Sequence, residues 1–525
     1  MKFEVIDTEP RNITVELDNT ECFMPAEAVK VMVNDIEYHA ENRNVFSIGG
    51  LEPDKEYEVS IIDHEGICER KVIKTSYESV LLDVSEFGAV GDGKNDDTAY
   101  IQAAISSCPL DGTVYLGKGT FLSGPLFLKS GVHIWIDKGA TLLGKTDRQS
   151  YPILPGMTLY TDETAEFNLG TWEGNPLSCF AALITGINVH DVKIFGEGTI
   201  DGNAQSGDWW INPKEKAGAW RPRLIFLKEC SNVTVQGITV QNSPSWTIHP
   251  YYSEAINLIG LSIKNPDNSP NTDGIDPESC SDVNIIGTTI SVGDDCIAIK
   301  SGKYYMALRH YKNTSNITVR NCRLNRGHGS VTVGSECAGG VNGVKVTRCL
   351  FDSTDRGLRI KTRRGRGEKS ILQNILFENI KMENVRMPFT INMFYFCDPD
   401  GHSEYCQSKE FMEVNEMTPS IKDITARNIE CAGVDVCLIT VYGLPESKVE
   451  EVTLENIKAI YMDEKDRAPE VPVMMDGIDK MSGRGIFVRN TKKLVIRDVE
   501  VTGTVDSEPD ISETDICDIE NVKLG

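Results

Sequence analysis

Three segments decide the fold: SNVTVQGITVQN at 231–242, INLIGLSIKN at 256–265 and SDVNIIGTTIS at 281–291. Each combines polar residues, often Asn or Asp, with alternating β-branched residues and a small turn. With Asn232, Asn257 and Asp282 as markers, the period is about 25 residues, which is typical of one coil of a solenoid.

Weaker copies of this pattern extend from INVHDVKIFG at 187–196 to KKLVIRDVEV at 492–501. A leucine-rich horseshoe has a similar period, but these units lack its leucine framework and its helical half. We therefore predict an all-β, right-handed parallel β-helix over residues 81–525. Its coils bury Ile and Val and leave polar side chains on one outer face, where they form a long groove.

The β-helix is preceded by two other features. In residues 85–108, Asn95 or Asp96 can cap a helix whose apolar face contains Ile101, Ala104 and Ile105, and this helix would cover the end of the core. Residues 1–80 contain short alternating runs that predict a small β-sandwich. The stretch 50–53 before Tyr57 resembles the tyrosine corner of fibronectin type III modules.

Composition limits the partners. The net charge of -25 over 525 residues argues against nucleic acid and against anionic membranes, because both attract basic surfaces. There is neither a signal-peptide pattern nor an apolar run of roughly 18 residues. The 15 cysteines are scattered, which favours reduced thiols. These features predict a cytoplasmic protein, with a secreted or periplasmic location as the alternative if a leader has been removed.

Four short motifs fall on successive coils and bear the chemistry. They are Asn271-Thr272-Asp273, Gly293-Asp294-Asp295, Gly327-His328-Gly329 and Arg359-Ile360-Lys361. Glycosidic hydrolysis with inversion needs a carboxylic acid for the leaving oxygen and a carboxylate for the attacking water. Crowded aspartates raise the pKa of at least one of them, so that it keeps its proton near neutrality.

Together these motifs resemble the polygalacturonase family of glycoside hydrolases, family 28, over roughly residues 80 to 505. The flanking stretches SPNTDGIDPESC (269–280), SVGDDCIAIKSG (291–302) and TDRGLRIKTRRGRG (354–367) look like its bacterial exo-acting branch. The resemblance implies that Asp294 is the general acid, that Asp273 and Asp295 activate the water, and that His328 lies beside the acid. It also implies a tyrosine at the cleavage subsite, where Tyr395 is the candidate.

The substrate implied is α-1,4-linked galacturonic acid. Arg359 and Lys361 alternate along one strand, so both side chains point to one face, where they can pair with a uronate carboxylate. The full set of expected substrate-binding residues is Asn271, Lys300, Arg359, Lys361, Arg363 and Tyr395. We expect no cofactor and no metal. Long inserts at 145–181, 396–420 and 463–483 favour exo action, because they can close one end of the groove.

Three alternatives stay open. A β-helical polysaccharide lyase would use calcium and an Arg or Lys base. A rhamnogalacturonan hydrolase is expected to depart from the histidine and RIK motifs. A β-helical sugar-binding module would have no need for all three aspartates.

Overall fold

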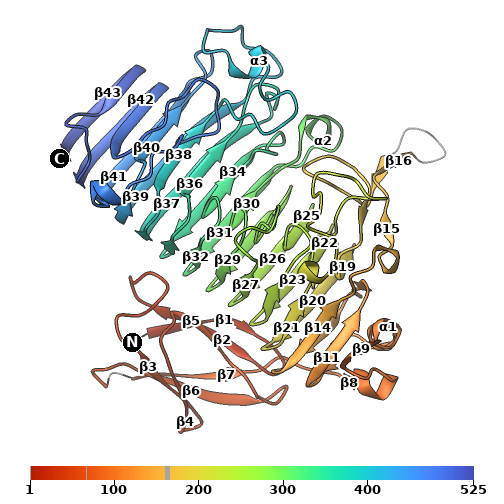
Figure 1. Ribbon diagram of the computed structural model, residues 1–525. Helices are drawn as coiled ribbons and strands as arrows, with labels where there is room; N and C mark the ends of the chain where they lie inside the picture. The colour runs from red at the N-terminus through yellow and green to blue at the C-terminus, as the bar shows by residue number, and fades with distance from the viewer. Residues whose placement is uncertain (1, 67, 160–165) are drawn as a thin grey trace.

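A computed structural model describes residues 2–66, 68–159 and 166–525. Its N-terminal unit consists of two antiparallel sheets (Figure 1). One contains β1 (Lys2–Thr8), β2 (Ile13–Asp18) and β5 (Val45–Ile48); the other contains β4 (Ile36–Glu41), β3 (Val29–Val33), β6 (Glu56–Ile62) and β7 (Cys68–Lys74). Apolar residues of both sheets form one buried core, as in a β-sandwich. Within it, the Glu52 N–H donates to the Tyr57 hydroxyl at 2.8 Å.

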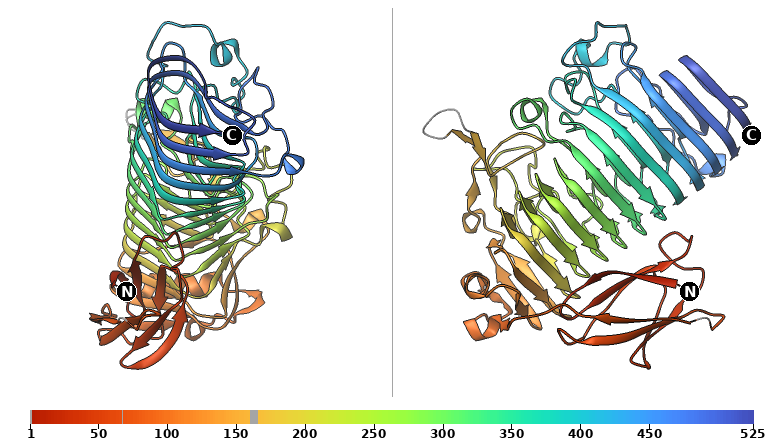
Figure 2. Two further views of the ribbon diagram at one scale, coloured as in Figure 1. Left: turned by 90° about the vertical axis from the view of Figure 1, so that its left-hand side faces the viewer. Right: turned by 180° about the vertical axis from the view of Figure 1, so that it is seen from behind.

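The rest of the chain is a parallel β-helix, which confirms the predicted fold class (Figures 1 and 2). One stack of strands, here called the groove sheet, bears the predicted motifs. In stacking order it contains β12 (Leu126–Phe127), β19 (Ile184–Ile187), β22 (Ile225–Lys228), β25 (Ile248–Tyr251), β30 (Ile297–Ile299), β33 (Val331–Val333), β36 (Arg356–Lys361), β38 (Met387–Asn392), β40 (Cys437–Tyr442) and the start of β42 (Arg484–Thr502). Ile275 bridges β25 to β30.

Two further stacks complete each coil. The second contains β8 (Leu81–Asp83), β10 (Gly112–Leu116), β13 (Val132–Ile136), β20 (His190–Gly196), β23 (Ser231–Gln236), β26 (Glu254–Ile259), β28 (Ser281–Ile286), β31 (Thr314–Arg320), β34 (Val341–Thr347), β37 (Ile371–Glu383), β39 (Ser420–Val434), β41 (Val449–Tyr461) and β43 (Asp510–Leu524). The third contains β9 (Asp92–Asp96), β11 (Gly119–Ser123), β14 (Ala140–Gly144), β21 (Thr199–Asp201), β24 (Thr239–Gln241), β27 (Ser262–Lys264), β29 (Thr289–Ser291), β32 (Arg323–Asn325) and β35 (Leu350–Asp352). It continues in the later halves of β37, β39, β41, β42 and β43, and β42 also runs through the second stack between β41 and β43.

The remaining elements are short and lie outside these stacks. The insert after β14 contains β15 (Ile153–Leu154), β16 (Met157–Leu159), β17 (Glu166–Asn168) and β18 (Cys179–Phe180). The helices are α1 (Thr98–Ser107), α2 (Tyr304–Arg309) and α3 (Glu404–Gln407), with 3-10 turns η1 (Val84–Phe87), η2 (Arg148–Ser150), η3 (Ala204–Ser206) and η4 (Glu464–Asp466). In the described part of the chain, no helix is long and apolar enough to cross a membrane.

The strand register corrects one marker of the repeat. Ser231 pairs with Glu254 and Glu254 with Ser281, so Asn232 and Asp282 are equivalent to Ala255. All three have positive φ, a conformation that Asn and Asp adopt more readily than most residues. Asn257, the predicted marker, pairs instead with Asn284. The prediction was wrong there because alanine occupies the turn in this coil.

Helix α1 buries Ile101, Ala104 and Ile105, the predicted face. Its N-cap is Asp97 rather than Asn95 or Asp96. The Asp97 carboxylate accepts hydrogen bonds from the backbone N–H groups of residues 90 and 91, while Asp96 accepts the N–H of Thr98. The Asp96 carboxylate therefore caps the first N–H of the helix, while Asp97 has the N-cap position in the backbone and holds the preceding turn. The sequence alone did not show how these two functions are distributed between the adjacent aspartates.

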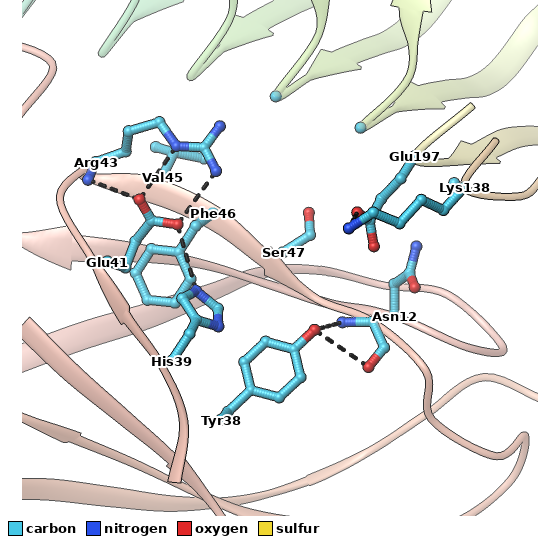
Figure 3. Close-up of a pocket in the computed structure, with 14 residues that line it drawn as sticks. Asn12, Tyr38, His39, Glu41, Arg43, Val45, Phe46, Ser47, Lys138 and Glu197 are labelled. Atoms are coloured by element: carbon cyan, nitrogen blue, oxygen red, sulfur yellow. Dashed lines mark hydrogen bonds and ion pairs between the residues drawn. The ribbon is translucent and has the colours of Figure 1, made fainter. Parts of the chain in front are cut away.

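The sandwich is docked against the turns that follow the second stack. Glu16, which is 7% exposed, forms ion pairs with Arg320 at 2.9 Å and with Arg348, and accepts a hydrogen bond from Asn321 at 2.7 Å. Val45 packs on Ile259 and Ile286 in a small apolar cluster. Beside this contact, a pocket of about 450 Å³ separates the two units and is lined by polar side chains (Figure 3). The interface between the two units therefore combines ion pairs, an apolar cluster and an open pocket.

Candidate active site

Backbone hydrogen bonds between coils bring the four motifs together. The N–H of Gly274 donates to Asp295 O at 3.0 Å, and the N–H of His328 donates to Asp294 O at 3.1 Å. Thr332 of β33 pairs with Arg359 of β36. As a result, carboxylate oxygens of Asp273, Asp294 and Asp295 lie within 4.8 Å of one another. The structure therefore places three carboxyl groups at one point of the groove sheet.

Asp295 is held by two cations. Arg359 Nη1 lies 3.0 Å from one carboxylate oxygen, and Lys361 Nζ lies 2.9 Å from the other. Burial acts to raise the pKa of Asp295, but Lys361 and Arg359 outweigh it and hold this pKa far below its ordinary value. Asp295 is therefore ionised. Both cations, expected to bind substrate, contact this aspartate and are themselves buried.

Asp294 faces His328, whose Nδ1 lies 3.4 Å from its carboxylate. Burial raises the pKa of Asp294, yet the contact with His328 brings it below the ordinary value. The same contact raises the pKa of His328. These opposite pKa shifts favour a proton on the imidazole of His328 over one on the carboxyl of Asp294.

Asp273 is the aspartate with the raised pKa. Burial is the largest cause, followed by the charges of Asp276 and Asp294, and only Lys300 opposes them strongly. Crowding was expected to keep one carboxyl protonated, and the resemblance made Asp294 the acid. The raised pKa lies on Asp273 instead, because His328 stabilises the charge of Asp294 whereas Asp273 lies deeper, beside another acid.

Lys300 lies beneath the aspartates. Its Nζ is 3.3 Å from Glu336, 3.6 Å from Asp276 and 3.8 Å from Asp273, and it also lies over the ring of Trp246 at 4.4 Å. Burial acts to lower the pKa of Lys300, but these carboxylates raise it well above its ordinary value. Lys300 was expected to bind substrate. In the structure its ammonium group contacts carboxylates of the protein itself.

The other expected substrate-binding residues lie at different distances from the aspartates. Asn271 accepts a hydrogen bond from Arg221 at 2.7 Å. The Tyr395 ring packs beside the cations, 5.2 Å from Lys361 Nζ. Arg363 is directed away, because its guanidinium pairs with Asp398 at 3.1 Å and Asp400 at 2.7 Å. Binding of substrate by Arg363 stays a prediction, and its described contacts are those of a residue that holds the insert at 396–420.

Sequence reasoning missed several buried groups around the site. Asp276 is three residues after Asp273, and that spacing was its only signal. Arg223 lies between the rings of Trp172 and Trp246, at 5.0 and 4.8 Å. Among the tryptophans of the chain, Trp209 is fully buried and Trp220 stacks on Trp172 at 4.8 Å. Aromatic residues in a sequence do not reveal whether they stack on sugar or on each other.

The three predicted inserts are connected. The backbone N–H of Lys303 donates to Gly174 O of the first insert at 3.0 Å, and Lys303 Nζ pairs with Asp398 of the second at 2.8 Å. Asp476 of the third contacts His402 of the second at 2.9 Å. Residues 160–165 of the first insert lie outside the described part of the chain.

The second and third inserts come from opposite edges of the groove sheet, because one follows the end of a strand and the other precedes the start of a strand. Residues 396–420 follow β38, whereas 463–483 lead into β42. They meet through His402 and Asp476, and the N–H of Asp476 also donates to Gln407 at 2.9 Å. Met474 of the third insert lies 3.4 Å from Arg359. The two inserts therefore meet over the coils that follow the aspartates.

Three carboxylates at this spacing could hold a cation. However, the cations Arg359, Lys361 and Lys300 already contact two of them. The arrangement offers one ionised carboxylate, one acid with a raised pKa and one carboxylate that shares a proton with an imidazole. This set suits acid–base hydrolysis.

Comparisons with known proteins agree with this geometry. The model of Glycosyl hydrolases family 28 matches residues 129–493, and a model named Rhamnogalacturonase A/epimerase, pectate lyase-like matches residues 81–149. A "Probable polygalacturonase" of Vitis vinifera is 30% identical over 380 residues, covering 71% of this chain and 72% of that protein. An "Endo-polygalacturonase" of Pectobacterium carotovorum is 31% identical over 374 residues, covering 69% and 83%.

Among solved structures, the family 28 exopolygalacturonase of Yersinia enterocolitica has a TM-score of 0.72 at 19% identity, and the match covers 100% of this chain and 98% of that one. At this identity the match concerns the fold, and it includes the N-terminal unit. The family match extends over the four motifs and the whole groove between them. This chain belongs to the glycosyl hydrolases family 28 and is a glycoside hydrolase.

Proposed function

We propose that this glycoside hydrolase cleaves α-1,4-linked galacturonic acid chains from one end. The observation that carries the proposal is the contact of Arg359 and Lys361 with the aspartate cluster, because two buried cations beside the reacting groups suit a substrate with a carboxylate on every sugar. The names of the relatives in Vitis and Pectobacterium agree with this substrate.

In the proposed mechanism Asp295 is the base. Arg359 and Lys361 keep it charged, and Asp273, which retains its proton, holds the attacking water with it. Asp294 gives its proton to the leaving oxygen. Before substrate binds, that proton rests on His328; when the sugar excludes water, the charged pair loses solvation, which favours transfer from the imidazole to Asp294.

Inversion of the anomeric centre is part of the proposal. The nearest carboxylate oxygens lie within 4.8 Å, closer than the roughly 6.5 to 9.5 Å of most inverting enzymes. Both oxygens of Asp295 pair with cations, which makes it a poor nucleophile while it can still orient a water. Proton NMR of the first product formed distinguishes the outcomes, because inversion of an α-linkage gives the β-anomer.

The inserts support exo action. Because 396–420 and 463–483 meet through His402 and Asp476, a polymer would encounter their contact beyond the aspartates. The test is time-resolved product analysis with oligogalacturonides labelled at the reducing end. Exo action at the reducing end releases one short labelled product from the first time point, and exo action at the non-reducing end shortens the labelled chain by a constant unit at each step. Labelled products of many sizes at the first time point would contradict exo action.

A lyase is the second candidate for the reaction, and a chelator separates the two. We expect full activity after dialysis against EDTA and no unsaturated product absorbing in the ultraviolet. Activity that is lost with EDTA and restored by calcium would move the assignment to a calcium-dependent lyase.

A further inference from the structure

Asp276 is an acid for which the proposed mechanism has no role. It follows Ile275, which bridges Ile248 to Ile297, so Asp276 lies on the outer face between His249 and Ala298. The same face continues through Thr332 and Arg359. Asp276 is therefore part of the floor of the groove, directly below the aspartate cluster, and its side chain is completely buried.

The surroundings of Asp276 do not suit a carboxylate. Within the described residues, no N–H or O–H group donates to either of its oxygens, and its nearest cation, Lys300, lies 3.6 Å away. Lys300 is also shared with Glu336 and Asp273. A buried carboxylate without hydrogen bonds is costly, whereas a neutral carboxylic acid is much less so.

Asp276 shares Lys300 with another carboxyl, that of Asp273, because Lys300 Nζ lies 3.6 Å from Asp276 and 3.8 Å from Asp273. One oxygen of Asp273 is likewise buried without a donor among the described residues. Two carboxyl groups in contact can form a hydrogen bond only when at least one of them is protonated. A shared proton therefore satisfies both groups at once.

We propose that Asp276 is a positioning residue that shares a proton with Asp273 and, against the charge of Lys300, keeps Asp273 the neutral member of the aspartate cluster. The role assigned to Asp273 rests on the proposed function, but the shared proton does not. Asp276 itself touches no reacting atom; it fixes where the carboxyl of Asp273 points and which oxygen bears the proton.

The charged groups around Asp276 agree with this assignment. Burial is the largest influence and raises the pKa of Asp276 to about 8. The charge of Lys300, the interaction with Asp273 and the charge of Arg223 oppose this rise, while Asp294 adds to it. On the preceding strand, burial lowers the pKa of His249, which contacts Glu278 at 3.0 Å. A neutral His249 adds no cation beside Asp276.

The sign of the pH dependence follows. An acid whose folded pKa is about 8, against about 4 when unfolded, stabilises the fold below pH 4 and loses that contribution as the pH rises to 8. For one proton, the ratio of folded to unfolded protein falls about tenfold per pH unit in this window. Asp276→Asn leaves Asp273 as the single acid of the pair, and without the charge of Asp276 it should release its proton at a lower pH. The stability of the variant relative to wild type should therefore rise over the upper part of the range from pH 5 to pH 8.

The experiment measures urea unfolding of wild type and Asp276→Asn between pH 5 and 9. Asp201→Asn is the matched control, because Asp201 is also buried but accepts hydrogen bonds from Asn203, Gln241 and Asn242. We expect the control to be destabilised by a similar factor at every pH. If Asp276→Asn behaves like the control, the shared proton does not exist. If the Asp276→Asn variant does not fold, Asp276→Ala replaces it in this experiment, because it also lacks the titrating group.

Kinetics on oligogalacturonides add a readout that a purely structural role would not change. Asp276→Asn can still hydrogen-bond Asp273, so kcat should fall less than about tenfold with KM unchanged; Asp276→Ala should lower kcat by roughly 10²-fold at similar KM. Equal kcat for the two variants would overturn the positioning role. A wild type inactive on these substrates would instead refute the proposed function, while the unfolding test would keep its meaning.

Discussion

At the residue scale, the first property to test is the ability of Asp294, paired with His328, to donate a proton. Asp294→Asn keeps the shape of the side chain but cannot donate a proton, so turnover should fall by about 10² to 10⁴-fold. Binding of an oligogalacturonide, measured by calorimetry, should change little. A variant that retains more than about a hundredth of wild-type kcat would contradict the role of Asp294 as acid.

Lys361 is expected to act on two partners. It contacts Asp295, and in the proposed function it also binds the substrate carboxylate. A charge-assisted contact contributes about 1.5 to 3 kcal/mol. Lys361→Ala should therefore lower kcat/KM on both charged and methyl-esterified oligomers, with a loss about ten times greater on the charged one. Equal losses on the two substrates would show that Lys361 supports Asp295 only.

The sequence predicted the clustering of these residues but not their protonation. The motif spacing was sufficient to bring Asp273, Asp294, Asp295, His328, Arg359 and Lys361 into one cluster, because in-register coils stack equivalent positions. It did not reveal which carboxyl has the raised pKa. That property depends on depth and on neighbours such as Asp276 and Lys300, which only the three-dimensional structure places.

At the element scale, the contact between the second and third inserts should control the site of cleavage. Replacing His402 and Asp476 by Ala removes the contact between their side chains and leaves the aspartates of the active site unchanged. We expect faster loss of viscosity of polygalacturonate per bond cleaved, since an opened groove accepts internal segments. His190→Ala with Asp191→Ala, an equally exposed pair remote from the groove, is the control. Unchanged viscosity curves would show that this contact does not limit access.

The insert lengths were visible in the sequence, and so was their predicted position at the groove. Their mutual contacts were not, because His402 and Asp476 are 74 residues apart and each lies in irregular chain. Loops lack the periodic pattern of apolar residues from which strands can be predicted. The β-helix itself was predictable for the opposite reason, since its many coils repeat one pattern.

At the scale of the whole molecule, the docking of the sandwich depends on Glu16. Its partners Arg320 and Arg348 are partly exposed, which reduces the cost of leaving them unpaired. Glu16→Gln should lower the free energy of unfolding by about 2 kcal/mol, measured in urea. Glu37→Gln, which breaks an exposed pair with Lys30, should change it by less than about 0.5 kcal/mol. Equal effects would mean that Glu16 does not hold the interface.

The docked sandwich also restricts how this solenoid can change in length. Its side chains contact residues on successive coils, from Lys193 through Gln236 and Arg320 to Lys381. Duplicating or deleting one coil in that span would displace every later contact by about 4.8 Å, the spacing of neighbouring strands. Among the described residues, no hydrogen bond or ion pair joins the sandwich to a coil beyond that of Lys381. Evolution or engineering can therefore lengthen the groove by adding coils after β39, while the coils beside the sandwich are fixed in number.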